Sequence, residues 1–344
     1  MTSGKKALFI LVCVAIALLP GTAFAQAAPA FTLSAATSTG VLYGEGFEYD
    51  YNQGVSANYK NSELDWPLQP LFYTEEALSL ATGIGIEARL DVKQGIPGNA
   101  GTMTDSDFLN GNGVRTHYSQ SESYAERALL VDVTLGYDLK IGESLTLAPY
   151  LAFSYMDFKW SARDGYYQYP TSGYEYYFTS SGTLVYGTLT PYDASETKTP
   201  LYGTGILYEQ AYLVGSAGLR ASYRFNKLTL GASFAYSPLA YCFSADDHLL
   251  RQITFTSTLT GGMMIEPSLS IQYAFTPRAS LSLTVDYRQL FNLLGDNTVI
   301  NQGTTATGSA GNYYAGPDSA STFTQDSGAA LWMLDASFLF KIEL

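Results

Sequence analysis

An alternation of apolar and polar residues with period two, carrying full charges on its polar face, most constrains the fold. Between Leu281 and Arg288 the apolar residues occupy every second position, and Ser, Thr, Asp and Arg occupy the others. Such segments are strands with two unlike faces. The same pattern predicts strands over 78–92, 129–139, 145–155, 219–225, 231–236, 268–275 and 332–344. A sandwich core would not accept these charges, whereas a barrel in lipid turns apolar side chains outward and polar ones inward.

The connections between these strands alternate in length. Residues 141–144, 226–227 and 276–279 read as tight turns. Long polar stretches separate them, at 93–126, 163–208, 237–262 and 289–329. Short turns at one end and long loops at the other are typical of outer-membrane barrels. We therefore expect an all-β, antiparallel transmembrane β-barrel with long extracellular loops.

The N-terminus reads as an export signal. Lys5 and Lys6 precede an apolar run over 7–19, and residues 23–25 (AFA) form a small-x-small cleavage site. We expect a signal peptide at 1–25 and one barrel domain at 26–344. Cys242 is then the only cysteine, so no internal disulfide forms. The 28 tyrosines and 18 phenylalanines suit the aromatic girdles of a membrane barrel.

The expected mature chain is strongly acidic. Without Lys5 and Lys6, 16 basic and 31 acidic residues remain, a formal charge of −15. This charge argues against nucleic acid as a partner. It favours cationic partners, although ordinary acidic solubility explains it equally well.

One polar segment contains a candidate general base. Asp246 and His248 are two apart and point to the same side of an extended segment. A carboxylate beside an imidazole fixes its tautomer and raises its basicity. The simpler interpretation is a charged, solvated loop tip.

A second acidic segment holds Asp105 and Asp107, which also face one way if the chain is extended. Like charges this close raise the pKa of one carboxyl group. A calcium loop does not fit, because its third ligand position falls on Leu109. A hydrated loop remains the alternative.

Taken in order, four segments resemble the omptins, the outer-membrane proteases of Gram-negative bacteria. They are 44–51 (GEGFEYDY), 62–66 (SELDW), 103–110 (MTDSDFLN), and 207–225 continuing to Asp246-Asp247-His248. Each motif is weak alone, but together they span nearly the whole mature chain. The resemblance implies ten strands, an outer-membrane location and an active site facing the extracellular side.

The resemblance also implies roles. Asp246 and His248 correspond to the catalytic dyad, and Asp105 and Asp107 to a facing pair, with a water molecule held between them as nucleophile. That is an aspartic-type endopeptidase which needs no cofactor and no metal. Glu48 corresponds to the pocket glutamate that receives a basic side chain, which implies cleavage beside Arg or Lys.

The chain departs from the family at several positions. Ser244 replaces a second pocket Asp, and His117 stands where many members have an acidic residue, unless it is only an exposed loop residue. Both changes weaken the case for a preference for paired basic residues. The lipopolysaccharide-binding positions read Phe153, Tyr155, Asp157 and Ala211. Because Asp157 would repel a lipid phosphate, activation by lipopolysaccharide is either absent or built differently.

The leading hypothesis is an outer-membrane endopeptidase that cleaves cationic polypeptides near basic residues. We expect it to be a monomer in contact with outer-membrane lipid. The alternative is a catalytically silent omptin-like barrel that acts as an adhesin or receptor. A porin is a third reading, but a ten-stranded interior is normally filled by side chains. The Tyr-rich loop at 163–208 either recognises a substrate or surface or covers the barrel rim.

Overall fold

The computed structural model describes residues 31–51, 60–181, 183–301 and 321–343. The expected signal peptide at 1–25 lies outside these residues, so its cleavage stays a prediction. The strands are β1 (Phe31–Tyr51), β2 (Lys60–Thr82), β3 (Ile86–Gly95), β4 (Gly98–Asp107), β5 (His117–Tyr137), β6 (Leu139–Ile141), β7 (Leu145–Gln168), β8 (Tyr177–Phe178), β9 (Leu184–Val185), β10 (Thr199–Phe225), β11 (Leu228–Ser237), β12 (Ala240–His248), β13 (Ile253–Gly261), β14 (Met264–Thr276), β15 (Ala279–Asn301) and β16 (Ser321–Glu343).

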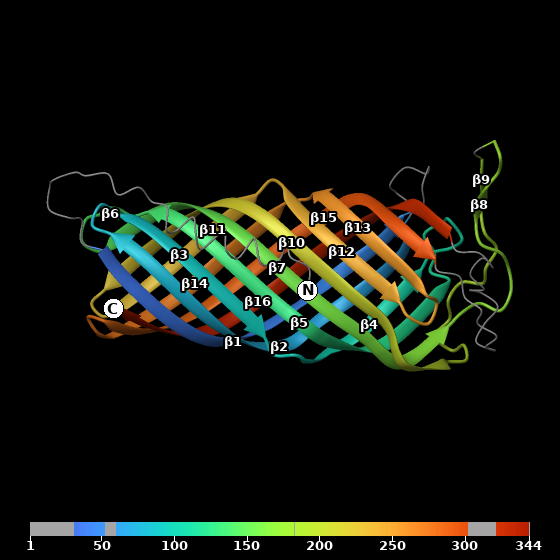
Figure 1. Ribbon diagram of the computed structural model, residues 1–344, viewed down its shortest axis with the longest axis horizontal. Coiled ribbons are helices and arrows are strands. Elements are labelled where there is room, and N and C mark those ends of the chain that lie inside the picture. Colours follow the sequence, from blue (N-terminus) through green and yellow to red (C-terminus); the bar gives the residue numbers. More distant parts are fainter. Residues whose placement is uncertain (1–30, 52–59, 182, 302–320, 344) are drawn as a thin grey trace.

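These strands form a closed antiparallel barrel, which confirms the predicted fold (Figure 1). Its wall has ten positions, here called staves, and each stave is one strand or two strands that follow one another in line. The staves are β1, β2, β3 with β4, β5, β7, β10, β11 with β12, β13 with β14, β15, and β16. The first and last staves close the ring, from Ser34 opposite Glu343 to Tyr51 opposite Asp326. Closure removes every unpaired sheet edge, as a strand structure in lipid requires.

Three staves are interrupted at residues that disturb a ladder. Pro97 separates β3 from β4, and Pro238 separates β11 from β12. Proline lacks the N–H that a central strand must donate, so it is confined to such breaks. Between β13 and β14, Gly261 and Gly262 have φ values of +83° and +62°, which glycine adopts without strain.

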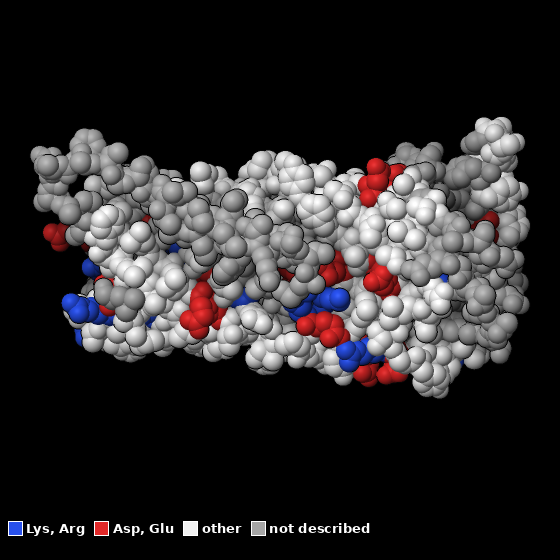
Figure 2. All heavy atoms as spheres, in the orientation of Figure 1, with Lys and Arg blue, Asp and Glu red and all other residues white. Residues whose placement is uncertain are grey.

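The outward face carries a belt of exposed apolar side chains. It includes Phe72 and Leu78 of β2, Leu151 and Phe153 of β7, Leu219 of β10, Phe234 of β11, Leu269 and Ile271 of β14, and Phe338 of β16. Most of the described wall visible in Figure 2 is uncharged. We assign this belt to the lipid. Within the described residues, no helix has the length and apolarity needed to cross a bilayer.

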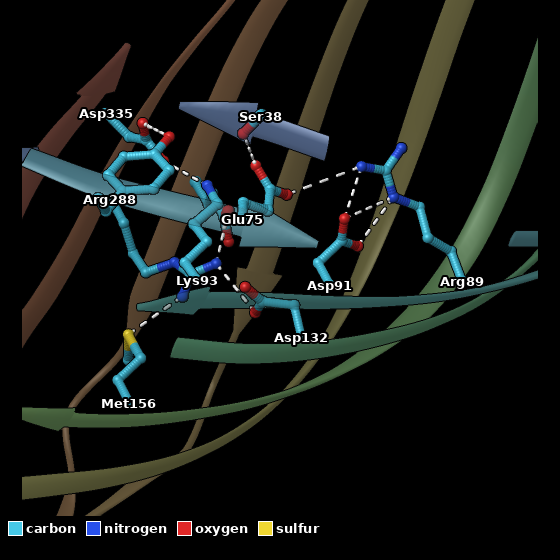
Figure 3. A network of polar contacts seen from close by, with 11 residues as sticks. Ser38, Glu75, Arg89, Asp91, Lys93, Asp132, Met156, Arg288 and Asp335 are labelled. Carbon is cyan, nitrogen blue, oxygen red and sulfur yellow. Dashed lines mark hydrogen bonds and ion pairs between the residues drawn. The ribbon is translucent and has the colours of Figure 1, made fainter. Parts of the chain in front are cut away.

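The barrel interior beneath the belt is filled by paired charges (Figure 3). Lys93 forms an ion pair with Asp335. Arg288 Nη2 lies 3.2 Å from an Asp132 oxygen and 2.8 Å from a Glu266 oxygen. Arg89, Asp91 and Glu75 form a further cluster, with 2.6 Å between Arg89 Nη2 and Asp91 Oδ1. The inward charges predicted from the alternation therefore neutralise one another.

The predicted single strand over 78–92 is wrong. The chain turns at residues 83–85, so β2 ends at Thr82 and β3 begins at Ile86. Gly85 has φ of +94°, and its N–H donates to the Thr82 carbonyl at 3.0 Å. The turn keeps the period-two pattern on both sides, so the alternation alone does not reveal it.

The other predicted tight turns are confirmed, but the long stretches are less irregular than expected. At 93–126, 163–208, 237–262 and 289–329 the strands continue well past the belt. The described irregular segments at this end are shorter, mainly 108–116 and 169–198. Strands of more than 20 residues exceed the 9–11 that cross a bilayer. The barrel therefore projects outward from the lipid.

The segment 169–198, which contains β8 and β9, packs on the segment that follows β4. Asn110 Nδ2 donates to the Leu189 carbonyl at 2.8 Å, and the Leu189 N–H donates back to Asn110 Oδ1 at 2.9 Å. The guanidinium of Arg115 lies 4.2 Å from the Tyr192 ring centre and 4.9 Å from the Tyr118 ring centre. This part of the Tyr-rich loop covers the barrel rim on one side.

Candidate active site

A pocket of about 90 Å³ opens at the end of the barrel that carries β8 and β9. Its lining residues come from β1, β2, β4, β12, β13 and the turn between the last two. They are Glu48, Asp50, Ser62, Leu64, Asp105, Asp107, Asp246, His248, Arg251 and Phe255. On β2 the pocket residue Leu64 is eight positions, roughly 26 Å of strand, beyond Phe72 of the lipid belt. The pocket therefore lies outside the membrane, and all five predicted site residues line it.

The Asp246–His248 pair forms the contact that the i, i+2 spacing predicted. His248 Nε2 lies 2.6 Å from Asp246 Oδ2. Asp246 is 3 % exposed, and its other oxygen, Oδ1, is buried without a hydrogen-bond partner among the described residues. The His248 ring contacts Phe255 edge-on, with ring centres 5.2 Å apart. The contact fixes the imidazole orientation and leaves Nδ1 as the nitrogen that the pair does not use.

Asp105 and Asp107 lie on β4 rather than in a loop, and both point into the pocket. The hydroxyls of Ser62 and Ser119 each lie 3.4 Å from an Asp105 oxygen. Burial raises the pKa of both carboxyl groups, while the nearby Arg251 lowers it. For Asp107 the negative charge of Asp105 adds to the rise. Such a pair favours sharing a proton.

Glu48 and Asp50 lie two apart on β1 and face the same pocket. Glu48 is 5 % exposed, and its Oε2 has no hydrogen-bond partner among the described residues. Burial raises the pKa of Glu48 well above its usual value, and the charges of Asp246 and Asp50 add to this. Burial also raises the pKa of Asp50 to about 6. A hydrogen bond from Asn297, at 3.3 Å, acts in the opposite direction and lowers this pKa.

Five lining residues were not predicted as site residues, and three of them are polar or charged: Asp50, Ser62 and Arg251. Asp50 was detectable, because it follows Glu48 by two positions on an extended segment. Ser62 begins the SELDW motif at 62–66. Arg251 belongs to the turn after His248 and carries no pattern that marks it.

The SELDW motif builds the wall and floor of the pocket. Alternate residues face inward, so Ser62 meets Asp105, Leu64 lines the pocket and Trp66 is fully buried beyond it. The Trp66 ring stacks on Tyr208 with centres 5.1 Å apart. Trp160 lies 6.1 Å from Trp66 and is also fully buried. This aromatic floor separates the pocket from the charged interior below.

His117 and Ser244 lie close to the site but do not line the pocket. The alternative that His117 is an exposed loop residue is wrong, since it begins β5 opposite Asp107 and is 1 % exposed. Its Nδ1 lies 2.9 Å from the Thr116 hydroxyl, and burial lowers its pKa to about 4. Ser244 shares the Asp246 face of β12 and pairs with Gln210 and Ser257 in the ladder.

The outer wall around Asp157 carries a charge cluster of its own. Arg127 Nη2 lies 2.8 Å from an Asp157 oxygen and 2.8 Å from a Glu209 oxygen. The Tyr155 hydroxyl donates to Asp157 at 3.1 Å. On the wall visible in Figure 2, acidic and basic side chains likewise lie side by side.

Comparisons with known proteins identify the family of this chain. The family model for the omptin family matches residues 30–325. The plasminogen activator of Yersinia pestis is 23 % identical over 291 residues, which cover 83 % of this chain and 85 % of that protein. Outer membrane protease OmpP of Escherichia coli K12 is 26 % identical over 95 residues, 28 % and 30 % of the two chains.

The fold also matches a solved structure. The crystal structure of outer membrane protease OmpT from Escherichia coli superposes with a TM-score of 0.74 at 17 % identity, covering 92 % of this chain and 98 % of that one. The family match extends over the described barrel except its last part, residues 326–343. The chain therefore belongs to the omptin family and is an outer-membrane protein.

Proposed function

We propose that this outer-membrane protease is an aspartic-type endopeptidase in which Asp246 and His248 activate a water molecule opposite Asp105 and Asp107. One observation carries the proposal: a single pocket contains the 2.6 Å dyad contact and both carboxyl groups of the pair. Its volume admits water, for which about 10–15 Å³ suffices.

In this mechanism His248 removes a proton from the water as its oxygen bonds to the peptide carbonyl carbon. Asp246 holds the ring and stabilises the imidazolium. The shared proton of Asp105 and Asp107 donates a hydrogen bond to the developing oxyanion, as a carboxyl group of raised pKa can. His248 then returns its proton to the amide nitrogen as the C–N bond breaks.

The substrate class follows from the acidic pocket. Glu48 is buried with an unpartnered oxygen, and a substrate cation supplies the missing partner. We propose cleavage of cationic polypeptides beside Arg or Lys at the extracellular side. The relative from Yersinia pestis is named a plasminogen activator, which agrees with a polypeptide substrate.

We further propose that no lipopolysaccharide phosphate binds around Asp157. The cations beside Asp157 are Arg127, which already pairs with Asp157 and Glu209, and Lys159, which lies opposite Arg127 and Glu209 in the ladder. The two acids balance these two cations, so the cluster has no excess positive charge to attract a phosphate. Activity measured in detergent should therefore be the same with and without added lipopolysaccharide, and a strong activation would contradict this proposal.

The experiment is to fold the protein in detergent and offer it a mixed peptide library, beside His248→Ala. Cleavage next to Arg or Lys that the variant loses would support both the dyad and Glu48. Cleavage next to other residues, also lost in the variant, would support the dyad but contradict the role of Glu48. No cleavage by a barrel shown to be folded would overturn the proposal in favour of the receptor or adhesin reading.

A further inference from the structure

The pocket contains a second carboxylate that the catalytic proposal does not use. Asp50 lies two residues after Glu48 on β1 and lines the same pocket. We propose that Asp50 is a specificity-determining residue, and that Glu48 and Asp50 together bind one guanidinium group of the substrate. The inference rests on the proposed function and names a second residue of its cation site.

The geometry of β1 suits one shared cation. Residues two apart on a strand have Cα atoms roughly 6.6–6.8 Å apart and side chains on one face. Two carboxylates at this spacing flank a space that a planar guanidinium with five N–H donors can enter. Lysine offers a compact ammonium with three donors but without the wide planar fork, so it spans two separated acids less well than a guanidinium does.

The two acids lack a cation of their own. Among the residues that the structure describes, none of the ion pairs involves Glu48 or Asp50. Arg251 acts at the other end of the pocket, where it lowers the pKa of Asp105 and Asp107. Glu48 Oε2 is buried with no hydrogen-bond partner among the described residues, and the only neutral donor that lowers the pKa of Glu48 is the Trp66 indole, so the site has no cation of its own.

Asp50 is also held in position from another stave. Asn297 of β15 is fully buried, and its Nδ2 donates to Asp50 Oδ1 at 3.3 Å. This amide, together with the side chain of Gln325 on β16, fixes the direction of the Asp50 carboxylate, and the lone pairs that these two donors do not use remain for a ligand. Position 244 on β12 is a serine and adds no carboxylate. The two acids of the proposed cation site, Glu48 and Asp50, therefore both come from β1.

The test uses three peptides that differ only beside the cleaved bond, which carries Arg, Lys or citrulline. Citrulline keeps the shape of arginine without its charge. Asp50→Asn should lower the Arg-to-citrulline ratio of kcat/KM at least tenfold, mainly through a higher KM for the Arg peptide. The Arg-to-Lys ratio should fall as well, because the second carboxylate serves the planar group.

The matched control is Asp296→Asn. Asp296 is the exposed neighbour of Asn297, so this variant removes the same charge from the outer wall. Its Arg-to-citrulline ratio should equal that of the wild type. The proposal is overturned if Asp50→Asn keeps the wild-type ratio, or if Asp296→Asn lowers it as much.

A second variant separates a binding role from damage to the fold. Asn297→Ala should lower the same ratio less than Asp50→Asn does, because it releases the carboxylate without removing it. Each variant is first checked for the folded mobility of an intact barrel on a gel. Failure of the proposed function looks different: the wild type then cleaves none of the three peptides.

Discussion

The barrel interior that the lipid belt encloses and the pocket outside the membrane both contain charged side chains. The two regions differ in whether these charges form ion pairs with one another. In the interior, Arg288 lies between Asp132 and Glu266, and Lys93 contacts Asp335. In the pocket, five carboxyl groups face one arginine and one histidine. Buried charges that are paired fill space and fix the barrel.

Buried charges without partners indicate function rather than stability. A buried unpaired acid costs stability, so it persists where a ligand or reaction uses it. Glu48, with its unpartnered Oε2, is of this kind. Asp246 is paired with His248 through Oδ2, and only its second oxygen, Oδ1, lacks a partner among the described residues. The contrast therefore assigns the interior to stability and the pocket to function, and each assignment is open to experiment.

The largest expected effect is on catalysis by the dyad. Asp246→Asn removes the carboxylate that orients His248, and we expect kcat to fall about 10²–10⁴-fold. Asp247→Asn is the control, because Asp247 alternates to the other face and accepts from Thr254 at 2.7 Å. Steady-state kinetics with one Arg peptide checks both. Equal losses in the two variants would contradict the assignment.

The next effect is on the stability of the interior. Arg288→Met leaves Asp132 and Glu266 without their cation, and we expect the free energy of unfolding to fall by about 3–5 kcal/mol. Urea titration of folding into detergent micelles measures this. The Arg-to-citrulline ratio of kcat/KM should not change. If Arg288→Met changed this ratio but not the free energy of unfolding, Arg288 would serve substrate recognition rather than stability.

A smaller effect of opposite sign is expected in the pocket. The pKa of Asp50 is about 6 in the folded protein and near 4 in the unfolded chain. Above pH 4 the unfolded state therefore binds fewer protons, so stability falls as pH rises towards 6 and stays low above it. Asp50→Asn should raise the free energy of unfolding by about 1–3 kcal/mol at pH 8, with almost no change at pH 4.

The same urea titration at the two pH values checks this prediction. Glu48 offers a second case, because burial and neighbouring acids raise its pKa as well. A loss of stability in Asp50→Asn at pH 8 would show that the hydrogen bonds to the Asp50 carboxylate outweigh the cost of burying its charge. The contrast between interior and pocket would then fail.

The smallest expected effect is on ion conduction. The ion pairs of Lys93, Arg288 and Arg89 fill the interior below the pocket, so the purified barrel should show no steady conductance in a planar bilayer. Steady, ohmic steps would favour the porin reading and contradict the filled interior.

The lipid belt was predictable from the sequence because membrane imposes a strict alternation there. Leu281 to Arg288 shows the pattern, and β15 contains it. Above the lipid both faces meet water or loops, so the alternation fades while the ladder continues. For that reason the sequence predicts loops where the outer parts of β10 and β15 continue as strands.

The site was predictable where its geometry is local. The contact between Asp246 and His248 follows from their spacing on one strand. The hydrogen bond from Asn297 to Asp50 joins residues 247 apart in sequence, and only closure of the barrel brings β1 and β15 close enough. Arg251 depends on the turn after β12, which no periodic pattern describes.

The most direct test is a crystal structure of His248→Ala with an uncleaved peptide that contains one arginine. We predict that the guanidinium lies within hydrogen-bond distance of both Glu48 and Asp50, with the adjacent peptide carbonyl facing Asp105 and Asp107. An arginine side chain bound outside the pocket, with Glu48 still unpartnered, would contradict the assignment of the unpaired acids to substrate binding.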